Sequence, residues 1–181
     1  MSTIKNIKSK IGQFNLRKRL KNQKRKVKTH NFNSAKSAGI LFSSPNEQSF
    51  IAVKNFLSFL STKDMKVIAL GYVPSKKIPQ EFLMRKGINF YCNTDLNWYY
   101  KPKNEIIEQF IHQDFDILFD LSMNEYFTVN YVGLLSKAQF KIGKQTANAY
   151  QDLVIDIKNN NTVDYLIEQI KHYLNILNNQ E

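Results

Sequence analysis

The sequence predicts an α/β protein with a Rossmann-like fold: an open, mostly parallel sheet of about six strands, helices on both faces, and a basic N-terminal arm that is helical or extended. Beyond residue 36, short apolar runs alternate with amphipathic helical segments. Three of these runs, at residues 68–70, 117–119 and 153–155, are apolar at consecutive positions. Strands that are buried on both faces have this composition, which favours a parallel sheet covered by helices.

The charges divide the chain into two parts. The first 46 residues contain twelve Lys or Arg and no Asp or Glu, which leaves 14 bases and 15 acids for the remainder. The net charge of +11 therefore belongs to the N-terminal segment. We assign residues 1–36 to a basic arm and residues 37–181 to a single Rossmann-like domain. An arm of this kind is suited to neutralising a polyanion.

Within the arm, a short amphipathic helix is expected over residues 4–14. Its apolar stripe consists of Ile4, Ile7, Ile11 and Phe14. From residue 17 to residue 28 nearly every side chain is a base or an amide, so repulsion between like charges predicts an extended or frayed segment. The apolar stripes that form the predicted core all lie beyond residue 37, so the domain is expected to fold without the arm.

The first half of the domain contains three predicted strands. The strand over residues 38–42 consists of apolar and small residues, and the helix over 45–60 carries Phe50, Val53, Leu57 and Leu60 on one face. A second apolar strand follows over 66–73. A weak helix over 80–86 separates it from a third strand over 88–92.

The second half continues the alternation after a loop rich in aromatic residues, 95–102. A helix over 104–112 leads to a strand over 115–121, and a helix over 123–136 leads to strands over 139–142 and 152–157. The last helix, over 162–177, has the clearest pattern, with apolar residues at three- and four-residue spacing along one face. These residues are Val163, Leu166, Ile167, Ile170, Leu174 and Leu177.

Two strand ends share a Ser-x-x-Glu pattern that matches a capping box. Ser44 with Glu47 and Ser122 with Glu125 are expected to begin the helices that follow. If the strand order is 3-2-1-4-5-6, both ends meet at the topological switch point, where open α/β sheets bind ligands. The possible ligand crevice there consists of Ser43, Ser44, Asp120 and Ser122. The two glutamates oppose an anion, so the capping role is favoured over a ligand site.

The sequence contains no catalytic signature, and no catalytic residue is assigned. The turn after the first strand lacks the glycines of a dinucleotide site, so no cofactor is expected. His30, His112 and His172 are scattered, and no metal is expected. The single cysteine, Cys92, cannot form an internal disulfide. No apolar run is long enough to cross a bilayer, and no apolar segment of a signal peptide follows the basic N-terminus, so a cytoplasmic protein is expected.

Aromatic and basic residues are interleaved in the loop that contains Trp98, Tyr99, Lys101 and Lys103. Such a loop can stack on unpaired bases while its lysines meet phosphate. The alternative is that the rings pack over the end of the sheet. The arm bases expected to bind RNA are Lys5, Lys8, Lys10, Arg17, Lys18, Arg19, Lys21, Lys24, Arg25, Lys26 and Lys28.

The chain resembles a small bacterial family of unknown function with a basic N-terminal arm. The stretches that carry this resemblance are SAKSAGILF (34–42), DLNWY followed by KP (95–102) and FDILFDL (115–121). Residues 115–121 with LLSKAQFKIG (134–143) are similar to the acceptor-side half of heptosyltransferase-type glycosyltransferases. Those enzymes have Gly-Asp where this chain has Ser43-Ser44, and their sugar-nucleotide half has no counterpart here. This second resemblance implies the fold and argues against transferase activity.

These observations rank the functions. We expect a non-catalytic protein that docks on RNA, ribosomal RNA above all, through its basic arm. The alternatives are a peripheral membrane adaptor whose helix over 4–14 lies on anionic lipid, and a small-ligand-binding or degenerate glycosyltransferase-like domain. A protein partner is also left open, because charge segregation alone does not identify the polyanion.

Overall fold

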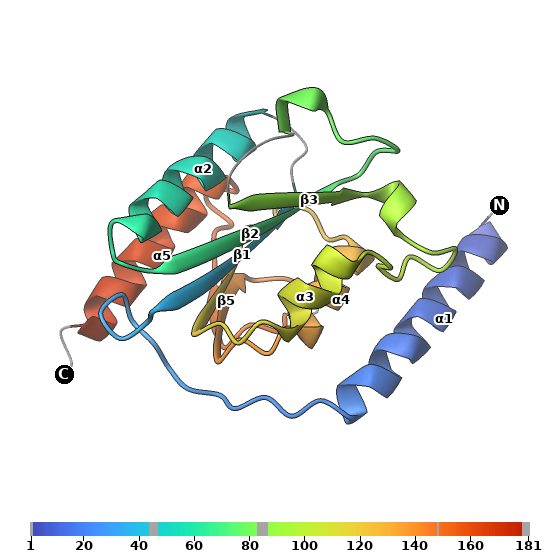
Figure 1. The fold of residues 1–181 in the computed structure, drawn as a ribbon, viewed down its shortest axis with the longest axis horizontal. Coiled ribbons are helices and arrows are strands. Elements are labelled where there is room, and N and C mark those ends of the chain that lie inside the picture. The colour runs from blue at the N-terminus through green and yellow to red at the C-terminus, as the bar shows by residue number, and fades with distance from the viewer. Residues whose placement is uncertain (1, 44–46, 83–86, 148, 179–181) are drawn as a thin grey trace.

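A computed structural model describes residues 2–43, 47–82, 87–147 and 149–178. Six parallel strands form one open sheet in the order β3-β2-β1-β4-β5-β6 (Figure 1). The strands are β1 (Ser37–Ser43), β2 (Lys66–Val73), β3 (Ile88–Cys92), β4 (Ile117–Asp120), β5 (Phe140–Lys144) and β6 (Leu153–Ile155). The predicted Rossmann-like class is confirmed, and the strand order is the one on which the expected switch point depended. The order reverses between β1 and β4, which makes the carboxyl ends of these two strands the switch point.

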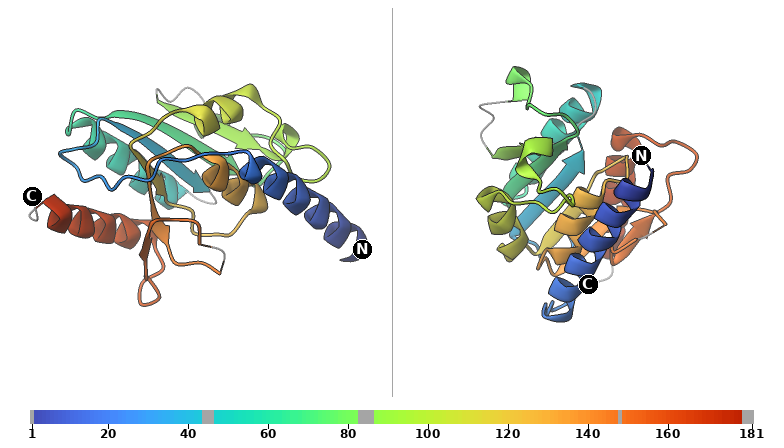
Figure 2. Two further views of the ribbon diagram at one scale, coloured as in Figure 1. Left: turned by 90° about the horizontal axis from the view of Figure 1, so that it is seen from below. Right: turned by 90° about the vertical axis from the view of Figure 1, so that its right-hand side faces the viewer.

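Helices cover both faces of the sheet. Helices α2 (Glu47–Ser61) and α5 (Val163–Asn178) pack on one face, and α3 (Glu105–His112) and α4 (Phe127–Leu135) pack on the other (Figures 1 and 2). Side chains of β1 alternate between the two layers, because Ile40 and Phe42 join the first core and Leu41 joins the second. Two short 3₁₀ helices, η1 (Gln80–Phe82) and η2 (Asn93–Asp95), flank β3.

Helix α4 begins four residues later than predicted, so the second capping box is wrong. Tyr126 is its N-cap, and it makes no side-chain capping hydrogen bond. Ser122 instead lies in the turn that leaves β4, where its N–H donates to Asp120 Oδ1 at 3.0 Å. After this turn, Lys144 Nζ donates to the Met123 carbonyl at 2.6 Å, and the helix begins only at Phe127. The other predicted cap, Ser44, lies outside the described residues.

The arm contains a longer helix than predicted. Helix α1 spans Ser2–Lys21, so residues 17–21, expected to be extended or frayed, are helical. Leu16, Phe32 and Ala35 are buried in the two cores, so the expectation that the core lies wholly beyond residue 37 is also wrong. After α1 the chain runs along one edge of the molecule toward β1, and the Lys28 N–H donates to the Gln139 carbonyl at 3.2 Å (Figure 1).

Candidate nucleic-acid interface

Helices α1 and α4 pack side by side and run in the same direction. An added Cβ at Gly12 would lie 3.0 Å from the Phe127 ring, which shows how closely the two helices approach. Farther along, Arg19 Nη1 donates to the Tyr131 hydroxyl at 3.0 Å. Leu16, one helical turn before Arg19, is 7% exposed and belongs to the core beneath. The inner face of α1 is therefore the Gly12–Leu16–Arg19 side.

Three members of the apolar stripe that predicted α1 face away from the domain, and the side chain of the fourth, Ile4, lies outside the described part of the chain. Ile7 is 51% exposed, Ile11 36% and Phe14 71%. The prediction of a helix was right for residues 4–14, but this stripe does not pack against the domain. The side that does pack includes Gly12, Leu16 and Arg19, with the partly buried Leu20, so it has only two large apolar residues and hydropathy marks it weakly.

Two of the predicted RNA-binding bases are salt-bridged to the domain. Arg19 makes a bidentate bridge to Glu108, with N–O distances of 2.8 and 2.9 Å. These hydrogen bonds raise the pKa of Arg19 and lower that of Glu108. Arg25 makes a second bidentate bridge to Asp152, at 2.7 and 2.5 Å, and also donates to the Ala138 carbonyl. Both arginines hold the arm in place.

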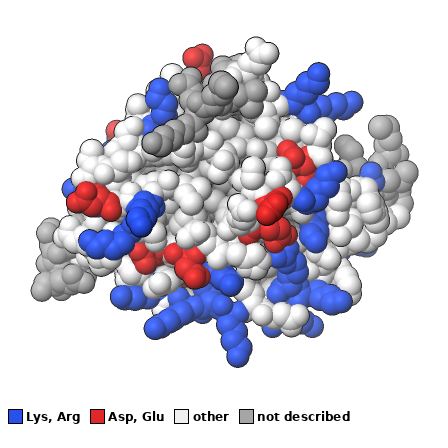
Figure 3. Space-filling model, in the orientation of Figure 1, with Lys and Arg blue, Asp and Glu red and all other residues white. Residues whose placement is uncertain are grey.

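The other bases of the arm are free of such bridges. Lys8 is half-buried, and Lys10, Arg17, Lys18, Lys21, Lys24, Lys26 and Lys28 are exposed. Within the described ranges, none of these eight forms a salt bridge. Lys5 belongs to α1, but its side chain is outside the described part. Lys and Arg side chains gather along the lower edge of the molecule, where the segment after α1 runs (Figures 1 and 3).

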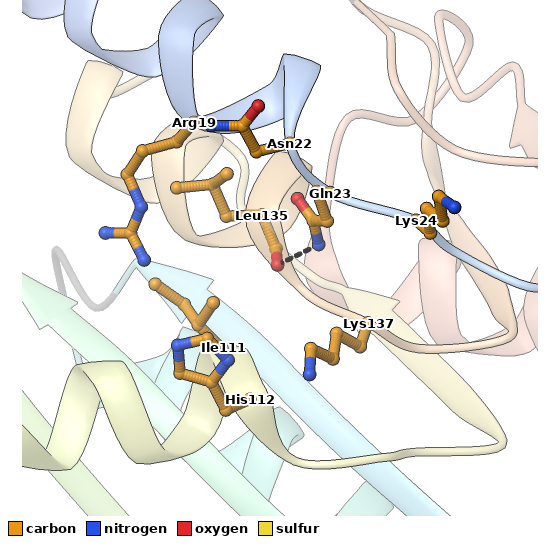
Figure 4. Close-up of a pocket in the computed structure, with 8 residues that line it drawn as sticks. All are labelled: Arg19, Asn22, Gln23, Lys24, Ile111, His112, Leu135 and Lys137. Atoms are coloured by element: carbon orange, nitrogen blue, oxygen red, sulfur yellow. Dashed lines mark hydrogen bonds between the residues drawn. The ribbon is translucent and has the colours of Figure 1, made fainter.

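A pocket of about 520 Å³ opens where α1, α3 and α4 end (Figure 4). Its lining residues are Arg19, Asn22, Gln23, Lys24, Ile111, His112, Leu135 and Lys137. The Gln23 amide donates to the Leu135 carbonyl at 2.5 Å, while its buried Oε1 has no hydrogen-bond partner among the described residues. Basic side chains here face three helix C-termini, whose partial negative charge they complement. Arg19 is neutralised by Glu108, so Lys24 and Lys137 are the lysines that give this recess its positive charge.

The aromatic loop lies against α1. The Tyr99 carbonyl oxygen would lie 2.8 Å from a Cβ added at Gly12, so this glycine allows the loop and the helix to touch. Trp98 is 58% exposed, and its ring meets the Tyr99 ring edge to face. Lys103 is exposed and Lys101 is half-exposed. The structure therefore brings the loop next to the basic helix at Tyr99, a proximity that the sequence does not indicate.

The switch-point residues that the structure describes are buried. Ser43 and Ser122 are 2% and 7% exposed, and neither hydroxyl has a hydrogen-bond partner in the described part of the chain. Burial raises the pKa of Asp120, although its carboxylate accepts from Tyr150 at 2.7 Å and from Gln151 at 3.1 Å. Sequence reasoning missed these two partners, because they lie 30 residues away and carry no motif.

Lys141 is a second buried ionisable group that the sequence did not mark. It is 3% exposed, and its ammonium donates to the Gly133 and Leu134 carbonyls at the end of α4, at 2.8 and 3.1 Å. Burial, with a smaller contribution from the Arg25 charge, lowers its pKa to about 7. Asp152 acts in the opposite direction. This lysine ties α4 to the edge of the sheet where the arm is attached.

No described helix is both long and apolar enough to cross a membrane, and no three described His, Cys, Asp or Glu side chains form a metal-binding group.

Comparison with known proteins identifies a family. No curated protein and no solved structure matches the chain significantly. The model of a family of unknown function, DUF6913, matches residues 8–177. The chain belongs to this family, and the match extends from within α1 to within α5.

Proposed function

We propose that this protein docks on structured RNA, in particular ribosomal RNA, through the exposed bases of α1 and residues 22–28. The observation that carries the proposal is the set of eight arm bases that form no salt bridge within the described residues. Cations of this kind release condensed counterions when they meet phosphate, which is the main source of affinity for nucleic acid. A cytoplasmic location follows from such a partner.

The attachment of the arm supports this proposal. The bridges from Arg19 to Glu108 and from Arg25 to Asp152 attach the most basic part of the chain to the domain at two points. Lys18, Lys21 and Lys24 are thereby held on one side of the domain instead of moving freely. Holding charges in place before binding reduces the entropy that is lost when the complex forms.

The salt dependence of RNA binding tests the proposal. If about six to eight bases meet phosphate, log K should fall with log salt at a slope of about −4 to −6, with the single-strand coefficient as a guide. Replacing Lys18, Lys21 and Lys24 by Gln should flatten the slope by about 2–3, since each lost phosphate contact removes about 1. The matched control replaces three exposed lysines outside the arm, Lys54, Lys63 and Lys66, and should leave the slope unchanged.

The cellular partner is tested by sedimentation. The tagged full-length protein should travel with ribosomal particles in a sucrose gradient and leave them after ribonuclease treatment. The triple arm variant should stay at the top of the gradient, and the triple control should behave like the wild type. Recovery of the wild type with membranes, unaffected by ribonuclease, would contradict the proposal.

A second candidate is a peripheral membrane adaptor, because Ile7, Ile11 and Phe14 are exposed on a basic helix. Burying these side chains in the headgroup region would add apolar affinity to the attraction of lysines for anionic lipid. Phe14→Ala distinguishes the two functions. It should leave RNA affinity unchanged, whereas it should lower binding to vesicles of anionic phospholipid if the membrane is the partner.

A third candidate is a small ligand at the switch point, favoured by the two buried hydroxyls of Ser43 and Ser122 that lack described partners. The resemblance to the acceptor-side half of heptosyltransferase-type enzymes belongs to this candidate. Thermal-shift measurements with nucleotides and sugar nucleotides test it. A dose-dependent rise in melting temperature that Ser122→Ala abolishes would place this candidate ahead of RNA docking.

A further inference from the structure

A second pocket lies outside the carboxyl ends of β2 and β3, between the aromatic loop and the start of α4. Its volume is about 240 Å³. Tyr72 from β2, Tyr100 from the loop, and Tyr126 and Phe127 from the start of α4 contribute four aromatic rings to its lining. This pocket lies at the same edge of the sheet as the switch point between β1 and β4, the edge at which open α/β sheets bind ligands.

The lining combines flat apolar faces with a few polar groups. Tyr72 donates its hydroxyl hydrogen to Asn93 Oδ1 at 2.5 Å, which orients the Asn93 amide. No other hydrogen bond of that amide group is found among the described residues, so its N–H groups can donate to a ligand. Glu125 contributes a carboxylate that can accept. The pocket therefore suits a planar ring with donors and acceptors on its edge, and the carboxylate disfavours a phosphate.

Tyr100 has an unusual backbone conformation. Its φ is +66°, in the left-handed region that side chains other than glycine rarely adopt. The turn is held by Asn97, whose carbonyl accepts from the Tyr100 N–H at 3.1 Å and whose Oδ1 accepts from Lys101 N–H at 2.9 Å. This turn keeps the Tyr100 ring 38% exposed at the pocket instead of burying it. Backbone strain of this kind is concentrated at functional sites.

The pocket adjoins the basic helix. Phe127 lines the pocket and also contacts α1 at Gly12. Arg19, which lines the basic recess, follows Gly12 by seven residues, so the two cavities are separated by roughly 10 Å along the helix axis. A nucleic-acid backbone that follows the bases of α1 would pass both cavities.

We propose that this pocket receives one unpaired nucleobase of the docked RNA, stacked on the tyrosine rings. The proposal rests on the proposed function, because the arm supplies the affinity for the backbone. An adenine base is the probe of choice, since its amino group can donate to Glu125 and its ring nitrogens can accept from Asn93.

The experiment compares two fluorescent ten-nucleotide strands in anisotropy titrations with the full-length protein. One strand is oligoadenylate, and the other is an abasic ribose-phosphate strand of the same length. The wild type should bind oligoadenylate about 5- to 140-fold more tightly, the range that stacking of one base provides. Tyr100→Gly removes the ring and suits the positive φ, so it should abolish this preference and leave the affinity for the abasic strand unchanged.

Tyr173→Ala is the control, because Tyr173 is similarly exposed, at 41%, but lies on α5. It should change neither affinity. Equal binding of the two strands by the wild type, or an undiminished preference in Tyr100→Gly, would refute the nucleobase pocket while leaving RNA docking intact. Failure of the wild type to bind either strand would also refute the nucleobase pocket, whereas RNA docking is refuted only if structured RNA does not bind in the salt-dependence experiment.

Discussion

Substituting Leu16 by Ala tests whether α1 is part of the folded domain. Leu16 is 7% exposed and packs into the core beneath α3 and α4. Truncating a buried leucine costs about 2–5 kcal/mol of the free energy of unfolding, and a site near the surface that can relax or admit water belongs at the lower end. We therefore expect a loss of about 2–3 kcal/mol. In a protein of this size that lowers the melting temperature by roughly 4–12 °C.

The assay is thermal and urea unfolding of the full-length protein, with Phe14→Ala as the matched control on the same helix. Phe14 is 71% exposed, so its truncation should change the free energy of unfolding by no more than about 0.5 kcal/mol. A melting temperature of Leu16→Ala that equals that of Phe14→Ala would refute the packing of α1 on α4. In that case the arm would be a free extension, as the sequence alone suggested.

Three further substitutions test the structure at other points. Gly12→Ala should lower the melting temperature, because its Cβ would lie 2.8 Å from the Tyr99 carbonyl oxygen. In a solvated helix the same substitution raises the free energy of unfolding by about 1 kcal/mol, and such a gain would contradict the contact. The folded-state pKa of Lys141 is about 7, below the unfolded value of about 10.4, so the unfolded chain binds more protons between these values and stability gains from rising pH. In Lys141→Met this contribution is absent. From pH 7 to 10 the free energy of unfolding of the wild type should therefore rise relative to that of the variant by up to about 1.4 kcal/mol per pH unit, and parallel curves in urea titrations would refute the shifted pKa. Tyr150→Phe leaves the buried Asp120 without its 2.7 Å donor and should cost about 1–3 kcal/mol in urea unfolding, whereas an unchanged midpoint would show that the hydroxyl is not needed there.

Much of the fold could be predicted from local pattern. The strand over residues 66–73 was predicted with the bounds that β2 has, and the last helix differs by one residue at each end. Both have a strong periodic or continuous apolar signal, because the sheet is buried on both faces and α5 buries one full stripe. Alternation of strands and helices predicted a parallel sheet, whereas the strand order was only assumed and is given by the structure.

The start of α4 could not be predicted in the same way. The Ser122–Glu125 pattern has the residues of a capping box, and local propensity favours a helix there. The structure instead uses the Ser122 N–H to satisfy Asp120 and the Met123 carbonyl to satisfy Lys144. A local bond to Asp120 and a tertiary bond from Lys144 thus take the place of a cap that contributes about 1 kcal/mol.

The sequence by itself determined that the molecule is an α/β protein, that its positive charge is concentrated in the first 46 residues, and that a helix lies near the N-terminus. Composition and short-range periodicity are sufficient for these properties. Only the tertiary structure decided which side of α1 is buried and which of its bases stay free. Arg19 is bound because Glu108 and Tyr131, about 90 and 110 residues away, meet it at one point. Such pairings depend on how distant elements approach in space, and no spacing within the arm encodes them.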